Sequence, residues 1–338
     1  MIMTVDLGNR SYDIITERGS LHRAAEYLDL DRKVMVVTDD GVPEEYAEAV
    51  RSAAKDGRTV TVAQGEASKC FEQYQRILSE MLSLGFGRGD CVVAVGGGVC
   101  GDLAGFAAAT YMRGVDFYNV PTTVLSMVDS SVGGKTAIDF RGVKNVIGAF
   151  KQPKRVLIDA DVLKTLPKRQ ISNGFAEAVK MALTFDEELF SVFETEDPMS
   201  YVDKIITRSL LIKKAVVEAD ETEKGLRRVL NFGHTIGHGI EAAVSPELYH
   251  GECVALGMLP MCSDKVRARL LPVLSKLKLP TRYDFDREKA FEAITHDKKG
   301  GGGFVKAIVV NEVGSFEEIK MTLDGLYGKM ISYYGENK

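Results

Sequence analysis

The stretch VVAVGGGVCGDLAGFAAATYMRG (residues 92–114) joins a buried-strand pattern to an alanine-rich helical pattern through three consecutive glycines. Gly96, Gly98 and Gly101 satisfy GxGxxG, which leaves room for backbone N–H groups to approach a pyrophosphate. The motif alone is weak, because a tight strand-to-helix turn needs the same small residues. The acidic residue expected about 20 positions later in a standard Rossmann dehydrogenase is missing. Asp39, which closes an earlier strand pattern, is the alternative partner for ribose hydroxyls.

Similar strand patterns precede this stretch, and helical patterns follow it. VMVVTDD (34–40), TVTVAQG (59–65) and CVVAVGGG (91–98) each end in Gly or Asp and lead into helical runs, which predicts a parallel α/β sheet. From about residue 168 long amphipathic patterns dominate. We therefore predict an N-terminal Rossmann-like α/β domain over residues 1–166 and a mostly helical domain over 167–338. Glycines at 300–303 predict a turn into one late strand, FVKAIVV.

Composition narrows the class of partner. The chain has 338 residues, with 43 Lys+Arg against 48 Asp+Glu, and its net charge of -5 makes a nucleic-acid partner unexpected. Neither a signal-peptide pattern nor an apolar run of about 20 residues occurs, so we expect a cytoplasmic protein without a membrane span that acts on small molecules. The five cysteines are odd in number and widely spaced, which predicts reduced thiols.

Four polar residues recur at helical spacing in GLRRVLNFGHTIGHGIE. Arg227, Asn231, His234 and His238 are spaced 4, 3 and 4 apart, which predicts that all four lie along one face of a single helix. A face that packs in a protein core would be apolar, so this stripe indicates ligand binding. His250 follows at a predicted helix start.

Histidines in such a cluster are typical zinc ligands, and a catalytic zinc site often adds a carboxylate. Glu177 in NGFAEAVKMAL is the candidate, three residues before Lys180 in an otherwise small and apolar helical pattern. Their surroundings predict that both side chains are buried, whereas the alternative is a surface ion pair.

A polar, glycine-punctuated stretch, VDSSVGGKTAIDFRGVKNVIGAF (128–150), carries Asp129, Lys135, Lys144 and Asn145. Lysines and backbone N–H groups together hold dianions, so the stretch suits a phosphate-binding loop; a surface hairpin with solvated lysines is the alternative. GGKT lacks the first glycine of a P-loop, which argues against nucleoside triphosphate hydrolysis.

Taken together, these segments resemble the dehydroquinate synthase family of the shikimate pathway. The blocks that carry the resemblance run in one order: GGGVCGDLAGFAAATYMRG, VPTTVLSMVDSSVGGKTAID, KNVIGAFKQP, NGFAEAVK, DETEKGLRRVLNFGHTIGH, YHGE and DKK. The resemblance covers about residues 35–315. It implies an NAD-binding first domain, a metal-binding second domain, a homodimer, and the conversion of 3-deoxy-arabino-heptulosonate 7-phosphate to 3-dehydroquinate and phosphate, with catalytic NAD and zinc or cobalt.

The resemblance also implies roles for residues of this chain. The metal ligands would be Glu177, His234 and His250. The NAD contacts would be Asp39, Glu66, Lys69, Gly97, Gly98, Val99, Asp102, Thr122, Thr123, Asp129 and Lys144. The substrate contacts would be Lys135, Asn145, Lys180, Lys213, Arg227, Asn231, His238, either Lys298 or Lys299, and Arg113, the last across a dimer interface. Lys213 and Arg227 would meet the substrate carboxylate, and His238 would relay a proton.

Two positions depart from the family pattern, and rival functions remain open. Gly41 stands where a polar ribose contact is common, and Gln170 replaces a frequent glutamate. The rivals are another NAD- and metal-dependent sugar phosphate cyclase, a metal-dependent polyol dehydrogenase and a non-catalytic relative. Lys135 and Asn145 argue against the dehydrogenase, and the complete set of proposed metal ligands argues against the non-catalytic relative.

Overall fold

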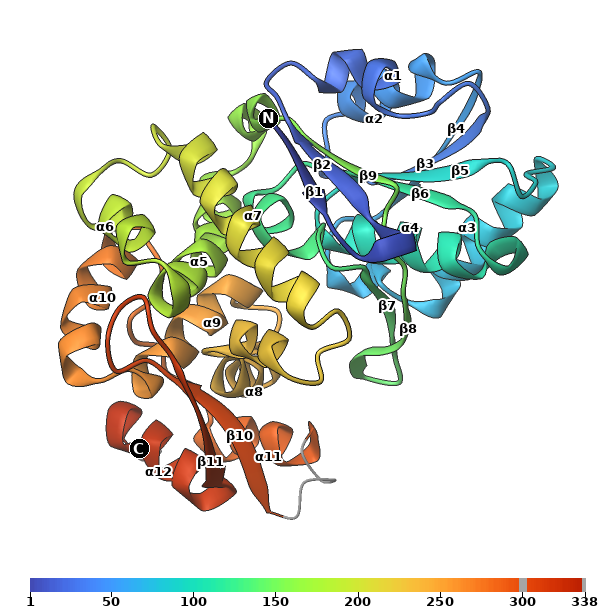
Figure 1. Cartoon of the computed structure of the whole chain (residues 1–338). Coiled ribbons are helices and arrows are strands. Elements are labelled where there is room, and N and C mark those ends of the chain that lie inside the picture. Colours follow the sequence, from blue (N-terminus) through green and yellow to red (C-terminus); the bar gives the residue numbers. More distant parts are fainter. Residues whose placement is uncertain (298–302, 336–338) are drawn as a thin grey trace. The chain divides into compact units, whose positions relative to one another are not determined.

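The computed structural model describes residues 1–297 and 303–335, and the chain divides into two compact units (Figure 1). The first unit is Met1–Pro167 with Lys213–Thr222, and the second is Lys168–Ile212 with Glu223–Lys338. Helix α7 (Val202–Ala219) starts in the second unit and ends in the first. The sequence does not predict this grouping, because α7 is one uninterrupted helical pattern.

A seven-stranded sheet forms the centre of the first unit, in the order β1-β2-β9-β6-β5-β3-β4. Its neighbouring strands are parallel except for the antiparallel pair β1 and β2, so the predicted parallel α/β sheet is confirmed. The strands are β1 (Ile2–Val5), β2 (Tyr12–Thr16), β3 (Lys33–Asp39), β4 (Asp56–Val62), β5 (Cys91–Gly96), β6 (Asp116–Pro121) and β9 (Arg155–Ile158).

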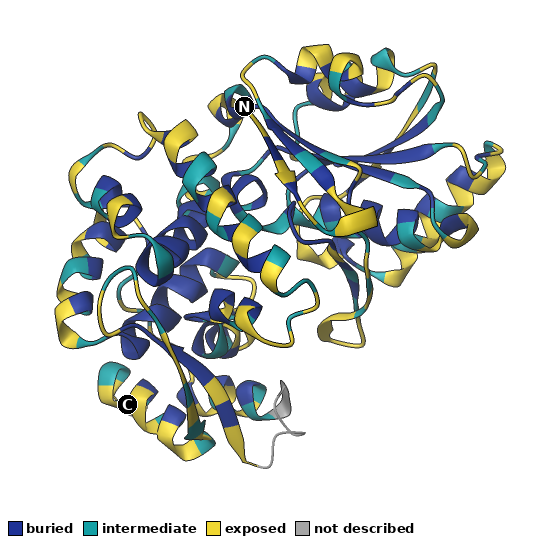
Figure 2. Cartoon of the chain, viewed as in Figure 1, coloured by how far each residue is buried: buried dark blue, intermediate teal, exposed yellow. Residues whose placement is uncertain are grey.

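Burial along the central strands explains why their sequences are nearly continuous apolar runs. Every residue of β5 is buried, as is every residue of β3 after Lys33, as expected for parallel strands covered on both faces (Figure 2). The α-helices that lie wholly in this unit are α1 (Ala24–Tyr27), α2 (Glu44–Ala53), α3 (Phe71–Ser83) and α4 (Gly98–Thr110).

Glycines let α4 pack closely on its neighbours. A Cβ atom on Gly105 would lie 2.3 Å from Thr136 Cγ2, and one on Gly101 would lie 3.2 Å from Asn119 Nδ2. One on Gly96 would lie 2.5 Å from Cys100 Sγ. Part of the glycine pattern is therefore required by packing, whatever the turn binds.

The stretch predicted as a phosphate-binding loop has regular structure. Residues Ser126–Ser130 form a short π-helix, η5, and the antiparallel strands β7 (Lys135–Phe140) and β8 (Val143–Phe150) form a hairpin. The prediction of an irregular loop is wrong, because the segment forms two paired strands. Alternating residues of β7 pack inward, whereas the residues of β8 from Val143 to Val146 are all exposed. The segment is therefore a hairpin, and phosphate binding by its lysines stays a prediction.

The second unit is mostly helical, as predicted. Its α-helices are α5 (Lys168–Phe185), α6 (Glu187–Thr195), α8 (His234–Val244), α9 (His250–Met258), α10 (Asp264–Lys276), α11 (Arg287–Asp297) and α12 (Leu323–Tyr334). The predicted late strand is β10 (Phe304–Val309), but it pairs with a strand that was not predicted, β11 (Glu317–Thr322). Within the ranges described above, no helix is long and apolar enough to cross a membrane. All five cysteines are free thiols.

The prediction of one helix carrying Arg227, Asn231, His234 and His238 is wrong. Leu226–Asn231 is a 3₁₀-helix, η7, and α8 begins only at His234. Between them Gly233 has φ +77, which ends the helical path, because this left-handed conformation suits glycine. Of these four residues, only His234 and His238 therefore share a face of α8.

Helices α8 and α9 approach each other through glycines. A Cβ atom on Gly257 of α9 would lie 2.0 Å from Gly233 O and 2.6 Å from Gly237 N. At the start of α9, one on Gly251 would lie 2.0 Å from Asn173 O of α5. Backbone therefore meets backbone where these helices cross, and His234 and His250 are the first residues of α8 and α9.

We expect Gly257→Ala to lower the free energy of unfolding by about 3 kcal/mol, the upper part of the range for overpacking, because the opposing atoms are backbone and cannot rotate away. Urea unfolding measures this change. Gly328→Ala on α12 is the matched control, because a Cβ atom there meets nothing within 4 Å. It should leave stability unchanged or slightly raised, and equal urea midpoints for Gly257→Ala and wild type would contradict the prediction.

Candidate metal and nucleotide sites

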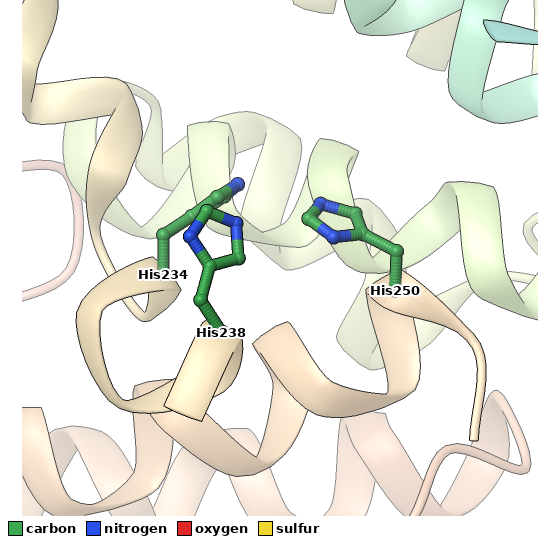
Figure 3. Close-up of side chains that lie close together, drawn as sticks. All are labelled: His234, His238 and His250. Atoms are coloured by element: carbon green, nitrogen blue, oxygen red, sulfur yellow. The ribbon is translucent and has the colours of Figure 1, made fainter. Parts of the chain in front are cut away.

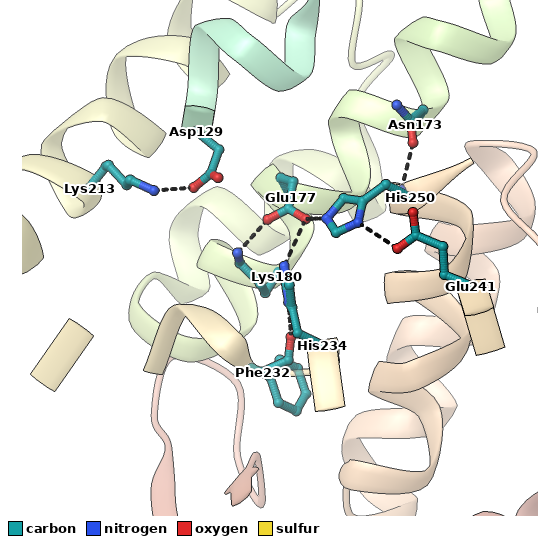
Figure 4. A network of polar contacts seen from close by, with 10 residues as sticks. Asp129, Asn173, Glu177, Lys180, Lys213, Phe232, His234, Glu241 and His250 are labelled. Atoms are coloured by element: carbon teal, nitrogen blue, oxygen red, sulfur yellow. Dashed lines mark hydrogen bonds and ion pairs between the residues drawn. The ribbon is translucent and has the colours of Figure 1, made fainter. Parts of the chain in front are cut away.

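Three elements of the second unit bring Glu177, His234 and His250 together (Figure 4). Glu177 lies within α5, and the two histidines begin α8 and α9. Glu177 Oε1 lies 3.5 Å from His234 Nε2 and 3.3 Å from His250 Nε2. The start of α9 is fixed to α5 because Gly251 N donates to Asn173 Oδ1 at 2.6 Å.

The two carboxylate oxygens of Glu177 have different surroundings. Oε2 accepts a hydrogen bond from the ammonium of Lys180, and both side chains are 1% exposed, which confirms the predicted burial of this pair. Oε1 is also buried, but it has no hydrogen-bond partner of acceptable geometry. A buried oxygen of this kind, faced by two imidazole nitrogens, fits a cation held between the three groups.

His238 lies next to the same cluster (Figure 3). Ring nitrogens of His234, His238 and His250 all lie within 4.8 Å of one another, so by distance His238 could also bind a metal ion. It is exposed, however, and the unsatisfied oxygen of Glu177 faces the other two histidines. The geometry therefore favours Glu177, His234 and His250 as the ligand set, with His238 beside it.

The other ring nitrogens of His234 and His250, which are both partly buried, also have partners. His234 Nδ1 lies 3.1 Å from the carbonyl oxygen of Phe232, and His250 Nδ1 lies 3.2 Å from Glu241 Oε2. Neither Phe232 nor Glu241 was predicted as a site residue. Glu241 could have been found, because it continues the spacing of His234 and His238 by three residues.

Electrostatics within the cluster favour a carboxylate anion. Burial raises the pKa of Glu177, but the ammonium of Lys180 and then His234 outweigh it and hold that pKa well below its usual range. Burial and Lys180 lower the pKa of His234 well below its usual range. Burial lowers the pKa of His250, but the neighbouring carboxylates of Glu177 and Glu241 outweigh burial and raise it to about 10.

In the first unit, predicted NAD contacts gather at one edge of the sheet. Strands β3, β5 and β6 are parallel neighbours, so their carboxyl ends lie together. Asp39 ends β3, the glycines at 97 and 98 follow β5, and Thr122 and Thr123 follow β6. Thr122 N donates to Gly96 O at 2.9 Å, which joins two of these turns.

Asp39 and Gly41 lie in a small polar group at this edge. Asp39 Oδ1 accepts from Gly41 N at 2.9 Å, and Asp39 Oδ2 accepts from Cys100 Sγ at 3.2 Å. A Cβ atom on Gly41 would lie 2.2 Å from the side-chain nitrogen of Gln64. The Gln64 amide therefore occupies the space that a side chain at position 41 would need.

Three further predicted NAD contacts form an ion cluster. Lys69 Nζ lies 2.8 Å from Asp102 Oδ2 and 3.2 Å from Glu66 Oε1. Burial raises the pKa of Asp102 to about 6 although Lys69 opposes it. Val99 lies beside them in the first turn of α4, and Lys144 is exposed on β8.

The predicted substrate contacts are divided between the units. Lys135, Asn145, Arg113 and Lys213 belong to the first unit, where Lys213 Nζ lies 2.5 Å from Asp129 Oδ1 in η5 (Figure 4). Lys180, Arg227, Asn231 and His238 belong to the second unit. Lys298 and Lys299 lie outside the described residues.

Two of the second-unit residues contrast in burial although η7 carries both. Arg227 is 2% exposed, whereas Asn231 is exposed and donates to Glu223 Oε1 at 2.6 Å. The guanidinium of Arg227 therefore lies in the interior of this unit, where a substrate charge would be poorly screened.

Solved structures define the class of protein. The chain is similar to 2-epi-5-epi-valiolone synthase from Streptomyces hygroscopicus subsp. jinggangensis 5008, solved with NAD+ and Zn2+ bound, at 26% identity and a TM-score of 0.87 over 97% of this chain and 98% of that one. A 2-deoxy-scyllo-inosose synthase complexed with carbaglucose-6-phosphate, NAD+ and Co2+ shares the fold at 23% identity and a TM-score of 0.89, over 98% of this chain and 100% of that one. The chain thus has the fold of the sugar phosphate cyclases.

Sequence relatives define the family within that class. Models of the 3-dehydroquinate synthase N-terminal and C-terminal regions match residues 59–173 and 174–300. The 3-dehydroquinate synthases of Enterococcus faecalis (strain ATCC 47077 / OG1RF) and Thermoanaerobacter pseudethanolicus (strain ATCC 33223 / 39E) are each 40% identical to it, over 95% and 93% of this chain and 96% and 95% of those proteins. The chain belongs to the 3-dehydroquinate synthase family. It is an enzyme of the lyase class, and the family places it in aromatic amino acid biosynthesis.

Proposed function

We propose that the protein converts 3-deoxy-D-arabino-heptulosonate 7-phosphate into 3-dehydroquinate and phosphate. Membership of the family supports this reaction. The observation that carries it is the buried, unpartnered Oε1 of Glu177, which faces the ring nitrogens of His234 and His250. A site of this kind requires a cation, as the reaction does.

Glu177, His234 and His250 hold one divalent metal ion, zinc or cobalt. Imidazole and carboxylate groups suit both metals, so these three residues would hold either one. Because Lys180 occupies Oε2, Glu177 offers the metal a single oxygen. The relative at 26% identity was solved with Zn2+, which supports the same choice here.

NAD binds at the carboxyl edge of the first unit's sheet. The turn after β5 offers backbone N–H groups at the start of α4, which suits a pyrophosphate. Asp39 accepts from the ribose hydroxyls, and the threonines after β6 and the Lys69 cluster complete the contacts. Bound NAD supplies a reversible hydride acceptor, and the bound metal supplies a Lewis acid.

Cationic and amide groups of this chain hold the anionic ends of the substrate. Lys135 and Asn145 bind the phosphate, and Arg113 reaches it from the partner protomer. Lys213 and Arg227 bind the carboxylate, since a planar guanidinium matches a carboxylate in shape. Lys180, Asn231 and either Lys298 or Lys299 orient the remaining groups.

His238 carries the proton relay. Its exposed imidazole lies beside the proposed ligands, with ring centroids 5.2 Å from His234 and 5.6 Å from His250. Its imidazole would therefore exchange a proton between substrate held beside these histidines and solvent.

A cytoplasmic homodimer is the proposed assembly. The β7–β8 hairpin exposes several large apolar side chains, which is typical of a surface that a second copy covers. They are Phe140, Val143, Val146 and Phe150. Sedimentation at micromolar concentration tests this assembly, and a monomer would exclude the proposed role of Arg113.

Phosphate release from the heptulosonate phosphate tests the proposed reaction. The assay compares metal-stripped protein with protein given NAD alone, zinc alone or both. Release that depends on both supports the proposal. Equal release without either, or no release with both, would refute it.

Turnover is expected to require NAD without consuming it, because the hydride leaves and returns to one carbon within a cycle. The absorbance of reduced nicotinamide should therefore show no net gain while phosphate accumulates. Stoichiometric accumulation of NADH would instead support a polyol dehydrogenase.

A further inference from the structure

Both ring nitrogens of His250 face carboxylates from other helices. Nε2 lies 3.3 Å from Glu177 Oε1 of α5, and Nδ1 lies 3.2 Å from Glu241 Oε2 of α8. The side chain of Glu241 is 12% exposed, so water only partly screens this contact. His250 is the first residue of α9, where no preceding helical turn restrains its ring.

The partners of Nδ1 decide which nitrogen carries the proton. An ionised carboxylate and a backbone carbonyl can only accept hydrogen bonds, so Nδ1–H must donate to Glu241 in His250 and to Phe232 O in His234. Each neutral ring then directs the lone pair of Nε2 toward the side of Glu177 Oε1. Both histidines thus direct Nε2 toward Glu177. In His234 a backbone carbonyl holds the proton on Nδ1, whereas in His250 a side chain, Glu241, does so.

We infer that Glu241 is a positioning residue that fixes the ring and the tautomer of His250 for metal binding. The inference rests on the metal site of the proposed function. A carboxylate behind a histidine ligand orients the ring and raises the basicity of the coordinating nitrogen. Spacing places His234 and Glu241 seven residues apart, on one face of α8. Helix α8 therefore supplies one ligand itself and aligns a second that belongs to α9.

Zinc affinity of the variants Glu241→Ala and Glu241→Gln tests the inference, measured on the full chain by competition with a chromophoric chelator. We expect Glu241→Ala to weaken zinc binding by about 10- to 100-fold, the usual effect of removing such a partner. Glutamine keeps an acceptor for Nδ1–H but removes the charge, so Glu241→Gln should recover most of the affinity. If the alanine variant does not fold, the glutamine variant carries the test, with an affinity measurably below wild type.

Cobalt substitution provides a spectrum that a loss of packing alone would not change. The visible d–d absorption of bound Co2+ reports ligand geometry, and we expect it to change in Glu241→Ala and to remain near wild type in Glu241→Gln. Glu292→Ala, an exposed position on α11, is the matched control and should leave both affinity and spectrum unchanged. The urea midpoints of the metal-free proteins show whether each variant is folded.

Wild-type zinc affinity and cobalt spectra in both variants would overturn the inference. Because zinc binding is measured with the metal alone, the result is independent of turnover. If the wild type binds zinc but releases no phosphate from the heptulosonate phosphate, the proposed reaction fails while the role of Glu241 stands. If the wild type is active and Glu241→Ala binds zinc normally, only the role of Glu241 fails.

Discussion

His234→Ala and Glu177→Gln are each expected to weaken zinc binding by more than about 100-fold, because loss of a direct ligand should exceed the loss caused by removing an outer partner. A chelator should abolish activity in the wild type, and zinc or cobalt should restore it. Metal content after dialysis and competition with a chromophoric chelator measure the effect. The glutamine variant keeps an oxygen near Lys180, so the buried ammonium still has a partner. Its loss of zinc affinity therefore reports mainly the missing anionic ligand.

Zinc affinity of the wild type should also rise with pH. The pKa of His250 is raised to about 10 in the metal-free protein. Below that pH both ring nitrogens carry a proton and the ring is positively charged. Zinc requires the neutral ring and must displace one of these protons. Affinity should therefore be lost as pH falls.

His22→Ala is the control for the histidine variant, because His22 is exposed in the first unit and distant in sequence from the cluster. It should retain wild-type zinc affinity. Circular dichroism should show that His234→Ala keeps its helical content. Full activity of a metal-free preparation, or normal zinc content in folded His234→Ala, would refute the metal site.

Arg227→Ala is expected to lower kcat/KM for the heptulosonate phosphate by about 2 to 5 kcal/mol, the range for removing one partner of a desolvated charge pair. That corresponds to roughly 30-fold to several-thousand-fold, since about 1.4 kcal/mol is a factor of ten. Arg227 is 2% exposed, so water would not replace the proposed contact with the substrate carboxylate. Zinc content should survive, because Arg227 lies in η7 and is not one of the proposed ligands.

Arg228→Ala is the matched control. Arg228 is the adjacent residue, but it is partly exposed and lies 3.0 Å from Glu318 Oε2. Such pairs contribute little, so its kcat/KM should stay near wild type. Because removal of a buried arginine could unfold the protein, Arg227→Lys provides a second variant that keeps the charge and loses the planar fork. If folded Arg227→Ala processes the substrate as well as wild type, or if wild type prefers a sugar phosphate without the carboxylate, the carboxylate clamp is wrong.

The strands and the burial of Glu177 could be predicted because each depends on local composition. A parallel strand covered on both faces must be apolar along its length, and β3 and β5 are. A carboxylate and an ammonium three residues apart in an apolar helix must pair if they are buried, and Glu177 and Lys180 do. The predicted helix start at His250 is also confirmed, because α9 begins there.

The prediction of a single helix from residue spacing was wrong where the backbone changes direction. Arg227, Asn231, His234 and His238 fit one helical face, but a helical period cannot reveal a single residue with positive φ. Contact with α9 also requires glycine at this break, since a Cβ atom on Gly233 would lie 2.6 Å from Met258 Cγ. The prediction of an irregular loop over residues 128–150 was wrong for a similar reason, because the pairing of β7 with β8 is not visible in the local composition.

By itself, the sequence determined the parallel sheet, the helical second part, the residue types available for metal binding and, through its ordered motifs, the family. Only the tertiary structure decided that Glu177 Oε1 meets the ring nitrogens of His234 and His250, that Lys180 occupies Oε2, and that Glu241 stands behind His250. The physical reason is the distance along the chain over which each kind of signal acts. Periodicity and composition act within one element, whereas these contacts join α5, α8 and α9, and they depend on glycines that let the helix backbones touch.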